Sequence, residues 1–211
     1  ADCADVIEIG VPFSDPMADG VTIQRSSHLA IENGVRLRWI LNQLKTISIN
    51  TPIILMSYLN PLYVYGYTQL AQDSKDAGVD GFIVPDLPIE EGEELREILK
   101  LAGLGMIQLV TPATPEDRIK KIAAKSSGFL YAVTVKGVTG GNDGLPQEVT
   151  GYLETVKALT TIPVCAGFGV RSSSDVALLE PLVDGVIVGS ALVEAIEEQV
   201  SPVDFLTSLR A

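Results

Sequence analysis

The stretch Asp5-Val6-Ile7-Glu8-Ile9-Gly10 carries the pattern on which the fold prediction depends: a polar start, a short apolar run and a glycine exit. The same pattern, or a plain apolar run of similar length, recurs along the chain at residues 53–56, 80–86, 106–110, 128–133, 163–166 and 184–190. Such runs are typical of strands that are buried on both faces of a parallel sheet. The sequence therefore predicts seven strands.

Helical patterns lie between the expected strands. Apolar residues from Leu37 to Ile47 follow helical spacing, and further helices are expected over residues 68–77, 90–101, 115–124, 149–159, 173–179 and 191–198 and from Ser201 onward. Alternating strands and helices indicate a parallel sheet with helices packed outside it. We predict a single domain over residues 1–211 that has seven of the eight βα units of a (β/α)8 TIM barrel, with an open doubly wound sheet as the alternative. On this prediction one unit of ~25–40 residues precedes Ala1.

The composition excludes several classes of function. The 211 residues include 15 Lys and Arg against 27 Asp and Glu, a net charge of −12, which disfavours a nucleic-acid surface. No apolar run approaches the ~20 residues that a membrane span needs. Cys3 and Cys165 are expected to be reduced, buried thiols of a cytoplasmic protein, and no His or Cys cluster has metal-ligand spacing. The only histidine, His28, is expected on the surface near a helix start.

Two carboxylates near the beginning of the chain are candidate acid/base groups. Glu8 interrupts an apolar run, and strand alternation places it on the face opposite Ile7 and Ile9, which is the mouth of a barrel. Burial there would raise its pKa above the ~4.3 reference. The alternative is a glutamate that is held in an ion pair inside the barrel. Asp19 lies on the glycine- and proline-bearing loop that follows, where a solvated turn aspartate is the alternative.

Glycines late in the chain point to a phosphate site. They occur at residues 137–141, at residues 167–169, and at Gly189-Ser190 directly before an expected helix. Glycine lets the backbone approach a ligand, and a helix start presents free N–H groups to an anion. A phosphate site after the last two strands recurs in barrel enzymes. An ordinary turn is the alternative for any one of these glycine stretches.

The segment Glu8–Gly20 (EIGVPFSDPMADG) resembles the signature of the tryptophan synthase α-subunit family. The similarity continues in order along the chain, through residues 23–24, 55–61, 84–88, 137–140, 167–169 and 189–191. The resemblance implies a lyase of tryptophan biosynthesis that cleaves indole-3-glycerol phosphate to indole and glyceraldehyde 3-phosphate by a retro-aldol step. Two positions depart from the family pattern: Val21 replaces a usual proline, and Lys136 stands where a small residue is common.

The resemblance also implies roles for individual residues. Glu8 matches the acid/base residue, Asp19 the group that stabilises the indole N–H, and Tyr131 a tyrosine of the active site. Other positions match phosphate contacts (Gly140, Gly169, Gly189 and Ser190) or line the substrate pocket (Tyr58, Asp86, Thr139 and Phe168). No metal and no cofactor is expected in this chain.

The implied partner is a β-subunit that carries pyridoxal phosphate, in an αββα heterotetramer, and the loop that contains Pro12 and Asp15 resembles part of the α–β contact surface. The compartment is expected to be the cytoplasm, or the plastid stroma for a plant protein. Three alternatives stay open: a stand-alone indole-releasing lyase, a non-catalytic α-type partner that activates a β-subunit, and another phosphate-binding barrel such as a sugar-phosphate isomerase or epimerase.

Overall fold

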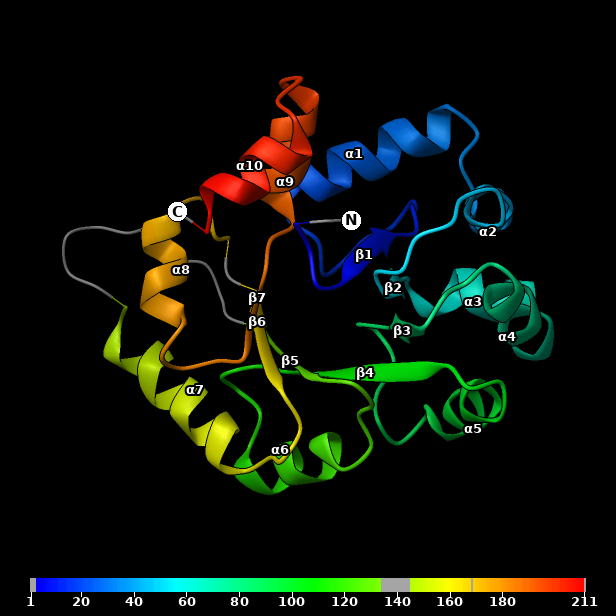
Figure 1. The fold of residues 1–211 in the computed structure, drawn as a ribbon. Coiled ribbons are helices and arrows are strands. Elements are labelled where there is room, and N and C mark those ends of the chain that lie inside the picture. Colours follow the sequence, from blue (N-terminus) through cyan, green and yellow to red (C-terminus); the bar gives the residue numbers. More distant parts are fainter. Residues whose placement is uncertain (1–2, 134–144, 168, 211) are drawn as a thin grey trace. The chain divides into compact units, whose positions relative to one another are not determined.

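The computed structural model of the chain describes residues 3–133, 145–167 and 169–210 (Figure 1). Its strands are β1 (Ile7–Gly10), β2 (Ile53–Met56), β3 (Gly81–Ile83), β4 (Gly105–Val110), β5 (Leu130–Val133), β6 (Val164–Gly167) and β7 (Gly185–Ile187). Its helices are α1 (Val21–Glu32), α2 (Leu37–Leu44), α3 (Leu59–Tyr65), α4 (Tyr67–Asp76), α5 (Glu93–Leu101), α6 (Glu116–Ala123), α7 (Gln147–Ala158), α8 (Ser173–Leu179), α9 (Ser190–Glu197) and α10 (Pro202–Ser208). Each expected strand is present: those expected over residues 53–56, 106–110 and 163–166 lie within one residue of their ranges, and the other four are shorter than expected.

The strands follow one another in the sheet in the order in which they follow one another along the chain. Every neighbouring pair is parallel, from β1 with β2 to β6 with β7. A doubly wound sheet instead reverses its strand order at a switch point. The consecutive order therefore excludes the doubly wound alternative and agrees with successive βα units of a barrel.

The chain forms two compact units, one ending at Ile107 and the other beginning at Gln108. The boundary falls inside β4, whose residues 105–107 pair with β3 and whose residues 108–110 pair with β5. Each unit therefore has its own set of parallel pairings. The expectation of a single domain stays a prediction.

The first unit has its core between its strands and the helices α2 to α5. Leu41, Leu55, Leu62, Leu70 and Phe82 are almost completely buried there. Ile9 of β1 packs against this cluster, whereas Glu8 next to it is exposed, so the expected alternation along β1 is confirmed. The side-chain direction of Glu8 thus follows from the packing of Ile9 against the core.

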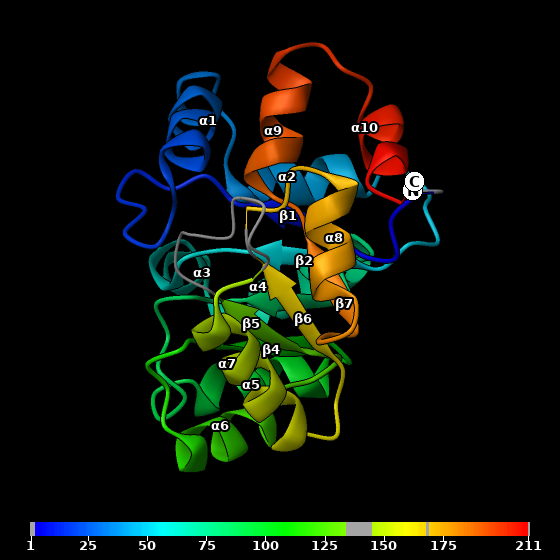
Figure 2. The same cartoon turned by 90° about the vertical axis from the view of Figure 1, so that its left-hand side faces the viewer.

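The second unit buries Leu130, Leu153, Val156, Val164 and Leu179. Its helices begin and end with conventional signals: acidic residues open α6 and two lysines close it, which favours the helix dipole. Ser201 caps α10, whose first residue is Pro202. Figure 2 shows α9 and α10 side by side, and contacts between the two helices agree with that view.

In each unit an aspartate accepts a hydrogen bond from the first residue of one strand, and the glycine after that aspartate begins the next strand. The Asp80 carboxylate accepts the N–H of Ile53 at 2.8 Å, and the Asp184 carboxylate accepts the N–H of Val164 at 2.8 Å. The glycine that follows each aspartate begins β3 or β7, and a Cβ there would lie 2.8 Å from the Gly105 carbonyl oxygen or 2.9 Å from the Cys165 sulfur. The two units therefore start a pair of neighbouring parallel strands in the same way.

Three expectations from the sequence need correction. Helices α1 and α3 cover segments outside the expected helix ranges, and His28 lies in the body of α1 and not near its start. Its side chain is exposed, as expected, and lies 3.3 Å from that of Glu32. Cys3 and Cys165 are free but only partly buried.

Among the described helices, none combines the length and the apolar character needed to cross a bilayer.

Candidate active site

Glu8 is a solvent-accessible carboxylate with the acidity of a buried one. Strand β1 presents it on the face opposite the core, and its surface is exposed. Desolvation by the surrounding protein atoms raises its pKa to about 7, and repulsion from Asp19 adds to this effect. Both properties hold when protein surrounds a side chain on most sides and one side is left to water. A pKa near neutrality allows the same group to accept and to donate a proton.

The ion-pair alternative for Glu8 is not supported. A neighbouring cation would lower the pKa of a carboxylate, whereas that of Glu8 is raised. Within residues 3–133, 145–167 and 169–210, no salt bridge involves Glu8. The electrostatic neighbour that acts on it is another acid, Asp19, and two like charges in one place are typical of acid/base sites.

The loop that carries Asp19 is tied to the body of the first unit at three points. The Ser27 hydroxyl accepts the N–H of Phe13 at 2.9 Å and donates to its carbonyl oxygen at 3.1 Å. The Tyr58 hydroxyl accepts the N–H of Ala18 at 2.8 Å. The Gln24 amide donates to the carbonyl oxygen of Asp19 at 2.9 Å. These bonds fix the backbone on both sides of the Asp19 side chain.

Tyr58 contacts both Asp19, the second candidate acid, and Phe13 on the same loop. It is buried, its ring stacks on Phe13 with the ring centroids 5.2 Å apart, and its hydroxyl hydrogen-bonds the Asp19 carboxylate. Desolvation raises the pKa of Asp19, while the Tyr58 bond lowers it. Desolvation also raises the pKa of Tyr58 to about 12, so the hydroxyl stays protonated as a donor. Asp19 is therefore a held, half-buried carboxylate and not a freely solvated turn residue.

Asp86 lies near Tyr58 and also accepts a backbone hydrogen bond at the start of α3. One of its carboxylate oxygens accepts the N–H of Leu59, the first residue of α3, at 2.8 Å. Its charge also contributes to the raised pKa of Tyr58. The first unit therefore brings together four of the residues predicted from the sequence: Glu8, Asp19, Tyr58 and Asp86.

Tyr131 is the predicted site residue on β5 of the second unit. It is partly buried, and β6 runs beside it with Cys165 as its register partner. A Cβ placed on Gly167 would lie 2.8 Å from Cε1 and 2.9 Å from Cζ of the Tyr131 ring. The ring therefore occupies the space that a side chain at position 167 would need, and Gly167 allows it to lie there.

Two of the predicted phosphate contacts can be examined for backbone geometry. Gly140, another predicted phosphate contact, and the predicted pocket residues Thr139 and Phe168 lie outside the described residues. Gly169 is exposed and has a φ of +65°, a left-handed conformation that favours glycine. Gly189 precedes Ser190, the first residue of α9, and is exposed at that helix start. In the first turn of α9 the N–H groups of Leu192 and Val193 donate to the Gly189 carbonyl oxygen, whereas those of Ser190 and Ala191 precede the first helical hydrogen bond, so they can donate to an anion.

Several residues that shape the site were not predicted from the sequence. Ser27 and Gln24 hold the acidic loop, and Gly167, predicted only as part of a glycine stretch for phosphate, makes room for Tyr131. The ion pair between Arg171 and Glu194 was not predicted either. The Gln24, Ser27 and Arg171 contacts span 5, 14 and 23 residues of chain, and Gly167 is further still from Tyr131, so no local motif marks them. Within the described residues, no group of three or more His, Cys, Asp or Glu side chains is arranged to hold a metal ion.

Comparisons with known proteins place the chain among characterised relatives. The sequence profile described as "Tryptophan synthase alpha chain" matches residues 1–206. The chain is 47% identical over 199 residues to the tryptophan synthase alpha chain of Carboxydothermus hydrogenoformans, covering 93% of this chain and 74% of that protein. It is 44% identical over 198 residues to the alpha chain of Bacillus cereus, covering 93% of this chain and 77% of the relative.

Solved structures show the same similarity. Tryptophan synthase subunit alpha from Legionella pneumophila matches with a TM-score of 0.86 and 36% identity, over 98% of this chain and 80% of that one. A tryptophan synthase complex from Pyrococcus furiosus matches with a TM-score of 0.87 and 37% identity, over 99% of this chain and 87% of that one. The likeness covers nearly the whole chain. Together with the consecutive strand order it confirms the predicted (β/α)8-barrel fold class.

Proposed function

The chain belongs to the tryptophan synthase alpha chain family and is a carbon–carbon lyase of tryptophan biosynthesis, and we propose that its substrate is indole-3-glycerol phosphate, cleaved to indole and glyceraldehyde 3-phosphate. The observation that carries the proposed mechanism is the near-neutral pKa of Glu8 beside a second carboxylate, Asp19. Family membership sets aside the alternative of a sugar-phosphate isomerase or epimerase.

The retro-aldol step needs two proton transfers. The side-chain hydroxyl of the substrate must lose its proton as the carbon–carbon bond breaks, and the indole ring carbon that carried the side chain must gain one. We assign both transfers to Glu8. A carboxyl group with a pKa of about 7 is present in both protonation states near neutral pH, which suits an acid/base group.

Asp19 is the proposed partner of the indole nitrogen. That nitrogen becomes cationic when the ring carbon is protonated, and a carboxylate beside it stabilises the charge. Desolvation raises the pKa of Asp19, the hydrogen bond from Tyr58 opposes that rise by favouring the charged form, and the three ties of its loop hold the group in place. The proposed roles of Glu8 and Asp19 are therefore separate: Glu8 moves protons and Asp19 stabilises the indole cation.

Other proposed contacts rest on the family resemblance and on local geometry. Tyr131 is proposed to contact the substrate, and Tyr58, Asp86, Thr139 and Phe168 are proposed to line the pocket. Gly140, Gly169, Gly189 and Ser190 are the proposed phosphate contacts. The left-handed turn at Gly169 and the free helix start at Ser190 support the last assignment for these two residues.

The proposed partner is a tryptophan synthase β-subunit. A tryptophan synthase complex is among the similar solved structures, which supports a partner of this kind. We propose an αββα assembly in which pyridoxal phosphate belongs to the β-subunit and the chain described here carries no cofactor of its own. The proposed location is the cytoplasm, and the plastid alternative has no support among the relatives above.

The test of the proposed function is the Glu8→Gln variant in an assay of indole released from indole-3-glycerol phosphate. We expect turnover to fall by about 10²- to 10⁴-fold, the usual contribution of a general acid/base group. The circular dichroism spectrum should be that of the wild type, because Glu8 lies outside the buried core. Unchanged turnover would falsify the assignment of Glu8, and absence of indole release by the wild type would refute the proposed substrate.

A further inference from the structure

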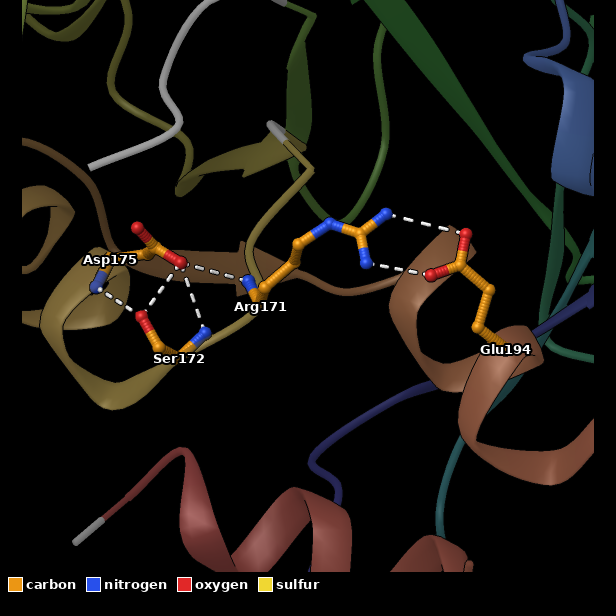
Figure 3. A network of polar contacts seen from close by, with 4 residues as sticks. All are labelled: Arg171, Ser172, Asp175 and Glu194. Carbon is orange, nitrogen blue, oxygen red and sulfur yellow. Dashed lines mark hydrogen bonds and ion pairs between the residues drawn. The ribbon is translucent and has the colours of Figure 1, made fainter. Parts of the chain in front are cut away.

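Arg171 and Glu194 form a two-pronged ion pair in the second unit (Figure 3). Nη1 of the guanidinium lies 2.6 Å from one carboxylate oxygen of Glu194, and Nη2 lies 3.3 Å from the other. This arrangement fixes orientation as well as distance, because two parallel bonds prevent rotation of either group. The hydrogen bond from Arg171 to Glu194 also raises the pKa of the arginine, so the guanidinium is charged throughout the neutral range.

The buried carboxylate of Asp175 holds the backbone of Arg171. Asp175 is only 6% exposed and accepts the N–H groups of Arg171 at 2.9 Å and Ser172 at 3.0 Å, as well as the Ser172 hydroxyl at 2.8 Å. Ser172 and Asp175 form a capping box that begins α8. Val170, the residue before Arg171, is buried. The arginine therefore extends toward Glu194 from a rigid base, as Figure 3 shows.

Each end of the pair lies close in sequence to a proposed phosphate contact. Arg171 follows Gly169 by two residues, across the buried Val170. Glu194 follows Ser190 by four residues, so both lie on one face of α9 about one turn apart. The pair thus connects the loop after β6 with the helix after β7.

We propose that Arg171 and Glu194 are positioning residues that set the distance between the Gly169 loop and the start of α9, so that backbone N–H groups of both meet one phosphate. This inference depends on the proposed function, because it assumes that Gly169, Gly189 and Ser190 bind the substrate phosphate. Both side chains are partly exposed, and exposed ion pairs contribute little to stability. The expected consequence of losing the pair is therefore weaker phosphate binding in a protein that is folded as before.

The test is a double-mutant cycle with Arg171→Gln, Glu194→Gln and the combined variant. Each single variant should raise the KM for indole-3-glycerol phosphate and the Kd for glycerol 3-phosphate about three- to fivefold, with kcat unchanged. The double variant should be no weaker than either single variant, because the two residues act as a unit. The reversed pair, Arg171→Glu with Glu194→Arg, should recover part of the lost affinity. Calorimetric titration and steady-state kinetics give these values.

Two controls separate the inference from the proposed function. Lys120→Gln removes an exposed ion pair with Asp117 on α6 and should leave both KM and Kd unchanged. Ser190→Asp places a negative charge at the start of α9, which suits the helix but repels phosphate, and should abolish glycerol 3-phosphate binding. If Ser190→Asp binds normally, the proposed phosphate site is wrong. If Ser190→Asp fails to bind while the Arg171 and Glu194 variants bind like the wild type, or if their effects add, only the positioning role is wrong.

Discussion

Glu8 makes the free chain less stable as its carboxyl group ionises. Its pKa is about 7 in the folded chain and 4.5 for a glutamate outside the fold, so the folded state holds the proton more tightly than the unfolded state does. The favourable contribution of the protonated group is complete below about pH 4.5 and is lost as the pH rises through about 7. The same property that suits Glu8 to proton transfer therefore lowers the stability of the fold at neutral pH.

We predict that Glu8→Gln raises the free energy of unfolding relative to the wild type at about pH 8 but not at about pH 4. Glutamine keeps the shape of the side chain and cannot ionise, so only the cost of the charged form is removed. Urea denaturation of both proteins at the two pH values measures the difference. An equal difference at both would mean that the pKa of Glu8 is not raised in the folded chain.

Tyr58→Phe tests the hydrogen bonds that hold Asp19. Phenylalanine keeps the stacking on Phe13 but removes the hydroxyl that accepts the Ala18 N–H and donates to Asp19. The pKa of Asp19 should rise, and kcat/KM should fall by about tenfold, the effect of losing about one buried hydrogen bond. The acidic limb of the pH–rate profile should move to higher pH. Tyr63→Phe is the control, since that side chain is exposed, and it should change neither value.

Gly167→Ala tests the position of the Tyr131 ring. The added Cβ would stand 2.8 Å from Cε1 of that ring, so the ring must move away. If Tyr131 contacts the substrate as proposed, kcat/KM should fall while the far-UV spectrum is unchanged. Gly151→Ala is the matched control: the space around that helical glycine is open, so the substitution should leave activity intact and stabilise α7 by about 0.5–1 kcal/mol. Full activity of Gly167→Ala would refute the proposed role of Tyr131.

Glu8 and Asp19 could be proposed as site residues from local signals and from the family resemblance, which alone favoured Asp19 over a solvated turn residue. An acid inside an apolar run and an acid on a glycine- and proline-bearing loop are visible without any knowledge of the fold. The residues that hold Asp19 were not predictable in this way. Ala18 and Tyr58 are 40 residues apart in sequence, and Phe13 and Ser27 are 14 apart, so their bonds exist only once the chain has folded.

At the scale of the elements, the strands were predicted well and two helices were missed. Buried strands need continuous apolar runs, which the sequence displays directly. Helix α1 buries none of its side chains and so lacks the apolar stripe that marks an amphipathic helix. Helix α3 contains Pro61, which is tolerated because it lies in the first turn, but which argues against a helix when it is met in a sequence.

The strand-start aspartates give a prediction at this scale. Asp80→Ala leaves the N–H of the buried Ile53 without its acceptor, and Asp184→Ala does the same to Val164. Each variant should lose about 1–3 kcal/mol of unfolding free energy, measured in urea. The side-chain bond with Lys157 and the backbone hydrogen bond from Val164 lower the pKa of Asp184. The stability that its charged form contributes is therefore present above the ordinary pKa of an aspartate and is lost as the pH falls through the lowered pKa of the folded chain.

Asp117→Ala is the matched control for both aspartate variants, because Asp117 is a highly exposed residue of α6 and caps no strand. It should lie within about 0.5 kcal/mol of the wild type. If Asp80→Ala or Asp184→Ala is as stable as Asp117→Ala, the bond from that carboxylate to the strand has no energetic role.

At the scale of the whole chain, the consecutive order of seven parallel strands is the feature that separated a barrel from a doubly wound sheet. The sequence predicted the alternation but not the order, because pairing is decided between segments that are distant in sequence. The division into two compact units at the middle of β4 was also not predicted. No composition change or linker marks residue 107, since a continuous strand crosses the boundary.

The partner hypothesis gives the prediction for the whole molecule. If the chain acts as the α-subunit of a tryptophan synthase complex, adding a β-subunit should order its loops and raise its rate of indole release. Turnover of indole-3-glycerol phosphate with and without a purified β-subunit decides between this hypothesis and a stand-alone lyase. High turnover of the chain alone, unchanged by the β-subunit, would support the stand-alone enzyme. A Glu8→Gln variant that still activates the β-subunit would show that the two activities are separable.

The two strand-start aspartates also supply a built-in pair of reporters. The amides of Ile53 and Val164 donate to equivalent carboxylates in different units. The rate at which each amide hydrogen exchanges with deuterated solvent therefore reports the opening of its own unit. Equal exchange rates over a range of denaturant would mean that both halves of the chain melt in one cooperative event. Unequal rates would reveal an intermediate in which one half has lost its structure while the other keeps it.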